Sequence, residues 1–166
     1  MILTGCKIIE AIHSGNIVIS GFTPDRVNPN SYNYRLGDEL KVYIGKDLEG
    51  VPIFNSVQIG PEGYVLRPGI AYLGVTDEII GSNLYAMSLI GRSSIGRLGL
   101  FLQISANLGH TTSCHRWTLE LYAARSIRVY PKMLIGQVSF WTNQGTVRCM
   151  GKTYALHNKP MESFLR

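Results

Sequence analysis

The sequence predicts an all-β protein, a sandwich or barrel of short strands preceded by one short helix. Short runs rich in β-branched and aromatic residues recur along most of the chain, and Gly, Pro or Asn bounds them. One segment near the N-terminus instead has the apolar spacing of a helix. With 166 residues, the chain is long enough for one domain, 1–166, that buries roughly 70% of the surface exposed by the unfolded chain.

The N-terminal helix is expected to begin after Thr4, which can serve as its N-cap. Ile8, Ile9 and Ile12 then lie on one helical face, and Gly15 supplies a C-terminal stop. These signals predict a short amphipathic helix that packs against the strands.

Eight segments are expected to be strands because they are short, rich in β-forming residues and bounded by turn residues. They are residues 17–19, 41–44, 64–66, 71–75, 84–90, 117–122, 126–130 and 137–141. Residues 67–69 and 130–132 contain Pro and are expected to form turns between strands, and residues 47–50 to form a hairpin tip.

Composition limits the class of partner. The formal net charge is +5, yet the basic residues are scattered, which disfavours a nucleic-acid surface and suits a small polyanion such as a nucleoside triphosphate. No apolar run is long enough to span a membrane. Three cysteines and an N-terminus without signal-peptide features predict a cytoplasmic protein, or one of the host cytoplasm if the chain is virally encoded.

Glu120 is the most informative residue, because it is the one acidic residue between Glu78 and Glu162. It lies in the apolar run 117–122, with Leu119 and Leu121 on either side. Such a carboxylate needs cationic partners or takes a raised pKa, and either outcome suits a general base. The position would also suit a polar residue on the solvent face of a strand, paired with an arginine.

The segment 91–100 has features of an anion site. It contains two guanidinium groups and two hydroxyls, which can hold a phosphate chain. A short helix is expected after Ser93 and Ser94, with Ile95 and Leu98 facing inward and its N–H groups aimed at an anion. The serines would equally serve as helix caps, and the arginines as ordinary surface or interface residues.

These segments, in this order and spacing, resemble the dCTP deaminase branch of the dUTPase superfamily. The resemblance includes residues 91–100, 117–121 and 131–137, and extends to residues 1–4, 28–37 and 64–69. It implies a distorted jelly roll or β-barrel of the dUTPase-like type that assembles as a homotrimer or dimer of trimers, with sites shared between subunits. It also implies Mg²⁺ carried by the nucleotide phosphates, and no zinc.

The resemblance assigns roles to individual residues. It makes Glu120 the general base for the water that attacks C4 of cytosine, with Arg97 and Ser93 as its catalytic neighbours. It implies that Arg92 and Ser94 hold the phosphates and that the Ala106 carbonyl accepts a hydrogen bond from the exocyclic amine. Five further residues are expected to contact the nucleotide: His110, Thr118, Lys152, Tyr154 and His157. Loss of ammonia from an aminopyrimidine needs such a base, together with donors for the tetrahedral intermediate.

The chain departs from the family pattern at several of these positions. His110 replaces an aspartate that contacts the deoxyribose, and it either bonds the 3'-hydroxyl or is a solvated turn residue. In the C-terminal segment 145–166, expected to be a lid over the nucleotide, His157 stands at a glutamine position and Cys149 at a tyrosine position. Lys152 is the best lid ligand, unless it is a solvated lysine on a mobile tail.

A metal site from His110, Cys114 and His115 is not expected. The spacing does not match the H-x-E and P-C-x-x-C elements of zinc deaminases, and the chain has no C-x-x-C.

Three functions remain open on these grounds. The first, favoured here, is hydrolytic deamination of dCTP to dUTP and ammonia, with dUTP and dTTP as further nucleotide ligands. The second is a relative that also cleaves the phosphate chain and releases dUMP, or that deaminates a 5-substituted dCTP. The third is a non-catalytic, nucleotide-binding regulatory trimer.

Overall fold

The computed structural model describes residues 1–148 and 157–163 of the 166-residue chain. These residues form helix α1 (Gly5–His13), the 3-10 helix η1 (Pro24–Arg26), helix α2 (Ser93–Arg97) and short strands throughout. The strands are β1 (Ile17–Ile19), β2 (Val27–Asn28), β3 (Ser31–Arg35), β4 (Glu39–Lys46), β5 (Pro52–Gln58), β6 (Tyr64–Leu66), β7 (Tyr72–Val75), β8 (Ile80–Ser82), β9 (Tyr85–Gly91), β10 (Leu100–Leu102), β11 (Leu108–Gly109), β12 (Cys114–His115), β13 (Thr118–Ala123), β14 (Ile127–Val129) and β15 (Leu134–Thr142).

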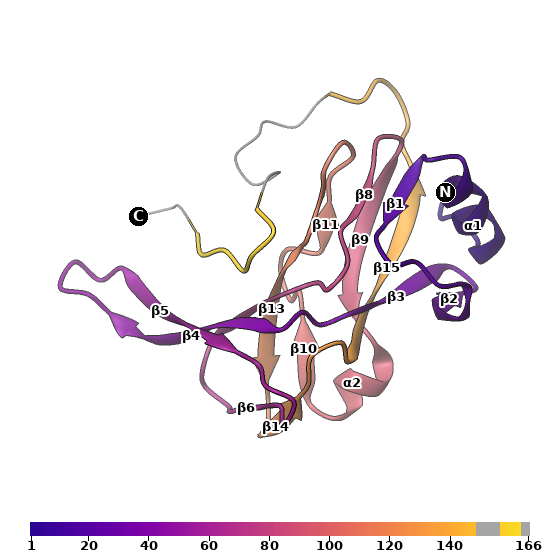
Figure 1. The fold of residues 1–166 in the computed structure, drawn as a ribbon. Helices are drawn as coiled ribbons and strands as arrows, with labels where there is room; N and C mark the ends of the chain where they lie inside the picture. Colours follow the sequence, from indigo (N-terminus) through magenta and orange to yellow (C-terminus); the bar gives the residue numbers. More distant parts are fainter. Residues whose placement is uncertain (149–156, 164–166) are drawn as a thin grey trace.

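Two five-stranded antiparallel sheets make up the body of the molecule (Figure 1). One has the strand order β10-β13-β7-β4-β5 and the other the order β11-β9-β15-β3-β2. A three-stranded sheet, β1-β8-β12, and the pair β14-β6 complete the arrangement. Buried side chains from both large sheets form one core, including Leu40, Tyr72, Leu119, Tyr34 and Phe140. The predicted all-β fold with a short N-terminal helix is therefore confirmed.

Helix α1 begins directly after Thr4, as predicted, although the Thr4 side chain makes no cap hydrogen bond. Ile8 is fully buried, and Ile9 and Ile12 are half-buried on the same side of the helix. Gly15 has a φ of 74°, the left-handed conformation that Gly adopts without steric cost and that ends the helical segment.

Each of the eight predicted strands overlaps a strand of the structure, and β1 and β6 have the predicted bounds. Strand β3 was not predicted, because four of its five residues are buried and its sequence therefore lacks apolar alternation. Strand β5 was also missed, since it is largely exposed and contains Asn, Ser and Gln.

Helix α2 confirms the predicted short helix, with Ile95 buried as expected. The expectation that Leu98 faces inward is wrong, because Leu98 is 53% exposed. The helix ends at Arg97, Leu98 is its C-cap residue, and Gly99 with a φ of 86° then turns the chain into β10.

The predicted hairpin tip joins β4 to β5. The Asp47 carboxylate accepts the backbone N–H groups of Glu49 and Val51 at 2.9 and 2.8 Å, which fixes the turn. This hairpin extends from the body of the molecule (Figure 1). Among the described residues, no helix has the length and apolar character needed to cross a membrane.

Candidate functional site

A cavity of about 770 Å³ opens beside β13, and Glu120 lines it. Four parts of the chain form its wall: the β4–β5 hairpin, β7, residues 103–120 and residues 157–163. Figure 1 shows residues 157–163, in yellow, passing above β4 and β13. Of the predicted site residues, the cavity is lined by Glu120, Ala106, His110, Thr118 and His157.

Strand alternation places Glu120 in this cavity. Leu119 and Leu121 are buried in the core, and Glu120 between them is half-buried on the opposite face of β13. No described residue forms an ion pair with the Glu120 carboxylate. The cationic neighbour expected from the sequence is thus not provided by the described part of a single chain.

Gln103 holds the backbone around Glu120, a role that the sequence did not reveal. Its Oε1 atom accepts the N–H of Glu120 at 2.7 Å, and its Nε2 atom donates to the Ala106 carbonyl at 2.9 Å. Gln103 itself has a φ of 52°, in the left-handed region that non-glycine residues rarely adopt. A carbonyl oxygen has two lone pairs, so the one at Ala106 keeps an acceptor site for a ligand.

Three of the four histidines of the chain, His110, His115 and His157, line the same cavity. His110 is exposed on the turn after β11, whereas His115 is only 8% exposed. The His115 ring stacks on Trp117 with 4.2 Å between centroids, and its Nδ1 atom lies 2.7 Å from the Arg116 carbonyl oxygen. Burial lowers the pKa of His115, and the nearby His157 lowers it further.

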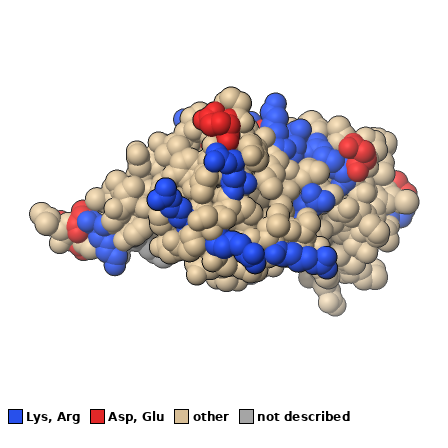
Figure 2. All heavy atoms as spheres, turned by 90° about the horizontal axis from the view of Figure 1, so that it is seen from below, with Lys and Arg blue, Asp and Glu red and all other residues tan. Residues whose placement is uncertain are grey.

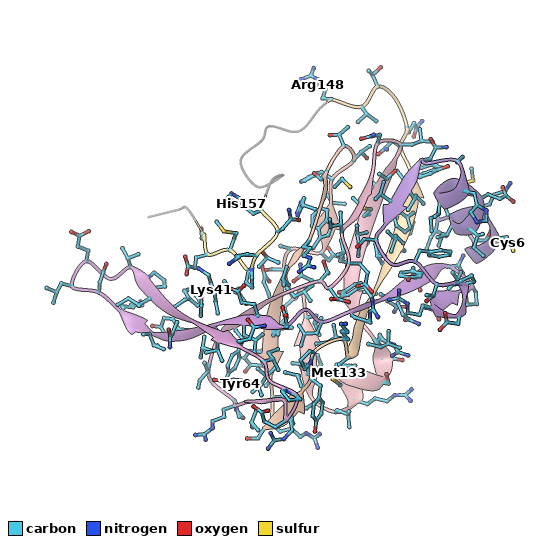
Figure 3. All side chains as sticks on the ribbon, viewed as in Figure 1. Cys6, Lys41, Tyr64, Met133, Arg148 and His157 are labelled. Atoms are coloured by element: carbon cyan, nitrogen blue, oxygen red, sulfur yellow. The ribbon has the colours of Figure 1, made fainter. Side chains whose placement is uncertain are left out.

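Hydrogen bonds attach the C-terminal segment to the mouth of the cavity. Asn158 accepts the Arg116 N–H at 2.9 Å, and the Met161 N–H donates to the Thr118 hydroxyl at 3.2 Å. Lys41 of β4 forms a 2.6 Å ion pair with Glu162. In Figure 3 the Lys41 side chain lies below residues 157–163, the segment that begins at His157. Lys152 and Tyr154, which were predicted to contact the nucleotide, lie outside the described residues. So does Cys149, which stands at a tyrosine position of the predicted lid.

The predicted anion-binding residues lie elsewhere. Arg92 and Ser93 line a second hollow of about 450 Å³, whose wall includes the exposed side chains of Phe101, Ile104 and Tyr122. Ser94 and Arg97 are exposed and line neither the cavity nor this hollow. A single chain therefore does not bring Ser93 and Arg97 into the cavity that contains Glu120.

The two hollows are neighbours along β13. Glu120 lines the cavity, and Tyr122, two residues further on the same face of the strand, lines the second hollow.

Within the part of the chain that the structure describes, no group of three or more His, Cys, Asp or Glu side chains is placed to hold a metal ion.

Comparison with known proteins identifies the class. A family model described as dCTP deaminase-like matches residues 2–143, and the chain therefore belongs to this family, as predicted. It is 42% identical over 167 residues to a dUMP-forming dCTP deaminase of Cytophaga hutchinsonii, covering 99% of this chain and 96% of that protein. It is 41% identical over 148 residues to a dUMP-forming dCTP deaminase of Clostridium botulinum, covering 87% of this chain and 84% of that protein.

A solved structure supports the fold. The 2'-deoxycytidine 5'-triphosphate deaminase of Agrobacterium tumefaciens matches this chain with a TM-score of 0.68 and 20% sequence identity. The match covers 86% of this chain but only 48% of the Agrobacterium chain. The names of the curated relatives correct one prediction, because dUMP-forming enzymes do not release dUTP as the end product. The prediction of dUTP as the product is therefore wrong, and the alternative in which dUMP is released is the better supported one.

Proposed function

We propose that this protein hydrolyses dCTP to dUMP, ammonia and pyrophosphate. The observation that carries the proposal is the Glu120 carboxylate, half-buried in a cavity of about 770 Å³ together with Ala106, His110 and Thr118. The dUMP-forming relatives, matched at 42% and 41% identity, support the choice of product.

In the first step, Glu120 takes a proton from a water whose oxygen forms a bond to C4 of cytosine. The same carboxylate then delivers the proton to the exocyclic nitrogen, the C4–N bond breaks and ammonia leaves. A positioned general base of this kind contributes roughly 10²- to 10⁴-fold to the rate. The Ala106 carbonyl, held by Gln103 on the wall of the cavity, is suited to accept a hydrogen bond from the exocyclic amine.

The proposal includes a second copy of the chain. In one chain, Arg92 and Ser93 line a different hollow from Glu120, so a site that combines them needs a neighbouring subunit to supply one part. The apolar rim of the second hollow supports a subunit contact, because Phe101, Ile104 and Tyr122 are 44%, 67% and 48% exposed. A homotrimer, or a dimer of trimers, is the assembly that we infer.

The surface charge suits a triphosphate that arrives with Mg²⁺. Figure 2 shows Lys and Arg side chains spread over the face seen from below, the side on which α2 lies in Figure 1. The positive electrostatic potential of these side chains attracts nucleotide phosphates. The Mg²⁺ would be bound by the phosphates of the substrate, residues 157–163 would cover the nucleotide, and no zinc would take part.

Product analysis tests the proposal. The purified protein is incubated with dCTP and Mg²⁺, nucleotides are separated by anion exchange, and ammonia and pyrophosphate are assayed. We expect dUMP, ammonia and pyrophosphate in equal amounts. Accumulation of dUTP with ammonia would remove the second hydrolysis from the proposal, and unchanged dCTP would remove both steps.

A further inference from the structure

His115 is a buried polar side chain on the wall of the cavity, and one of its ring nitrogens has no hydrogen-bond partner among the described residues. It is 8% exposed, and the Trp117 ring stacks against one of its faces. No described residue forms a hydrogen bond with its Nε2 atom, whereas every fully buried side-chain nitrogen and oxygen among the described residues has a partner. The Nε2 atom therefore keeps accessible surface, and His115 is one of the residues that line the cavity.

The contact at Nδ1 fixes the tautomer. The Arg116 carbonyl at 2.7 Å can only accept, so Nδ1 carries the proton and donates. In the neutral ring, Nε2 is then an acceptor with a free lone pair. Burial and the neighbouring His157 keep the ring neutral by lowering its pKa. A neutral acceptor does not pair with phosphate oxygens, but it can take a proton from water.

The proposed reaction contains a proton transfer for which no residue has yet been assigned. Release of pyrophosphate from a deoxynucleoside triphosphate needs a water activated beside the α-phosphorus, and Glu120 is already engaged at the pyrimidine ring. His115 precedes Glu120 by five residues, a span of at most about 18 Å in extended chain, and both line one cavity. One nucleotide can therefore be contacted by both residues, at different ends.

We propose that His115 is the general base of the phosphate-cleaving step, an inference that rests on the proposed function. Its Nε2 atom takes one proton from a water whose oxygen forms a bond to the α-phosphorus. The bond from that phosphorus to the bridging oxygen of the β-phosphate breaks, and pyrophosphate leaves with the electron pair. The imidazolium then returns its proton to solvent.

The other histidines of the cavity are less suited to this role. His110 is exposed on the turn after β11, and His157 belongs to the C-terminal segment. Five other titratable or charged groups line the cavity and face the same volume: His110, Arg116, Glu120, His157 and Glu162. Among the cavity histidines, His115 combines burial, a stacked ring and a defined tautomer.

The test variant is His115→Asn. The asparagine amide can still donate to the Arg116 carbonyl, because its Nδ2 atom occupies the place of Nδ1, but it has no counterpart of Nε2. With dCTP as substrate, we expect pyrophosphate release to fall by about 10²-fold or more while ammonia release is retained and dUTP accumulates. His13→Asn, at the exposed end of α1, is the control and should match the unmodified protein.

Other results would overturn the inference. Retained pyrophosphate release would make His115 a purely structural residue, and equal loss of both products in a folded, nucleotide-binding variant would place it in a step common to both. If the unmodified protein itself releases dUTP or nothing, the proposed function fails together with this inference. If the unmodified protein releases dUMP but His115→Asn still releases pyrophosphate at the unmodified rate, the proposed function stands and only the role of His115 is wrong.

A measurement on the unmodified protein tests the same inference without a variant. With dUTP as substrate, the rate of pyrophosphate release should decrease toward low pH with an apparent pKa below the ordinary histidine value of about 6.5, because burial lowers the pKa of His115. A decrease centred on the carboxylate value would assign the base to Glu120 or Glu162 and contradict the role of His115. Absence of dUTP hydrolysis would also contradict it.

Discussion

Gln103 and Glu120 are joined by two hydrogen bonds across the pairing of β10 with β13. The Gln103 side chain accepts the Glu120 N–H at 2.7 Å, and the Gln103 N–H donates to the Glu120 carbonyl at 3.2 Å. The same side chain also donates to the Ala106 carbonyl. One residue thus positions both the proposed base and the proposed reader of the exocyclic amine.

Replacing Gln103 by Ala should therefore lower turnover while leaving the fold intact. Two side-chain bonds are lost, at roughly 1 kcal/mol each, so the free energy of unfolding should fall by about 2 kcal/mol. A small misplacement of Glu120 should reduce kcat by about 10- to 100-fold. The exposed Gln144→Ala is the control. Unchanged kcat in Gln103→Ala would show that these bonds do not position the site.

The pair Arg26 and Glu78 should dominate the stability of the chain near η1. Glu78 is 1% exposed, and it accepts bonds from the Arg26 side chain, the Arg35 Nε atom at 2.9 Å and the Arg35 N–H at 2.9 Å. Glu78→Gln leaves the buried Arg26 charge uncompensated, and we expect a loss of about 3–5 kcal/mol in unfolding free energy. Denaturant titration measures it.

The control for this variant is Glu10→Gln, which breaks the exposed pair between Lys7 and Glu10 on α1. The midpoint of unfolding should not move in this control, because exposed pairs are screened by water. An equal effect of both variants would contradict the role assigned to the Arg26 and Glu78 pair.

His115 should make the stability depend on pH. Burial lowers its pKa in the folded state, so the unfolded chain binds the proton more readily. The free energy of unfolding should therefore fall as the pH decreases below about 6.5, the value of an unfolded histidine. Urea titrations on either side of this pH should show a smaller decrease for His115→Asn than for His13→Asn. Equal slopes would mean that His115 does not titrate differently on folding.

The turn after β14 offers a stabilising change. Lys132 has a φ of 61°, and the Met133 N–H donates to the Tyr130 carbonyl, a geometry that favours Gly at this position. Relief of left-handed strain outweighs the backbone entropy of Gly, so Lys132→Gly should raise the unfolding free energy by about 0.5 kcal/mol. Lys159→Gly, which lacks a positive φ, should not be stabilised; thermal melting compares the two.

The extent to which the fold could be predicted depends on local patterns. β1 was predicted to the residue, because an apolar segment lies between Gly15 and Gly21. β3 could not be predicted in this way, since four of its five residues are buried and its sequence shows no alternation of apolar and polar residues. Leu98 was placed wrongly because the end of α2 depends on Gly99, not on apolar spacing.

The candidate site was predictable where the chemistry is local. Glu120 was evident as an isolated acid in an apolar run, and the structure places it in a cavity with His110 and His157. The contributions of Gln103 and His115 depend on pairings of β10 with β13 and of β12 with β8, which join residues far apart in the sequence. The separation of Ser93 from Glu120 likewise depends on how the chain folds back on itself.

The most direct measurement is product release by Glu120→Gln with dCTP and Mg²⁺, together with nucleotide binding to the same variant. The substitution keeps the size of the side chain but removes the proton acceptor. We predict that binding and assembly are retained while ammonia release falls by about 10²- to 10⁴-fold. Ammonia release at the rate of the unmodified protein would contradict the assignment of Glu120 as the base.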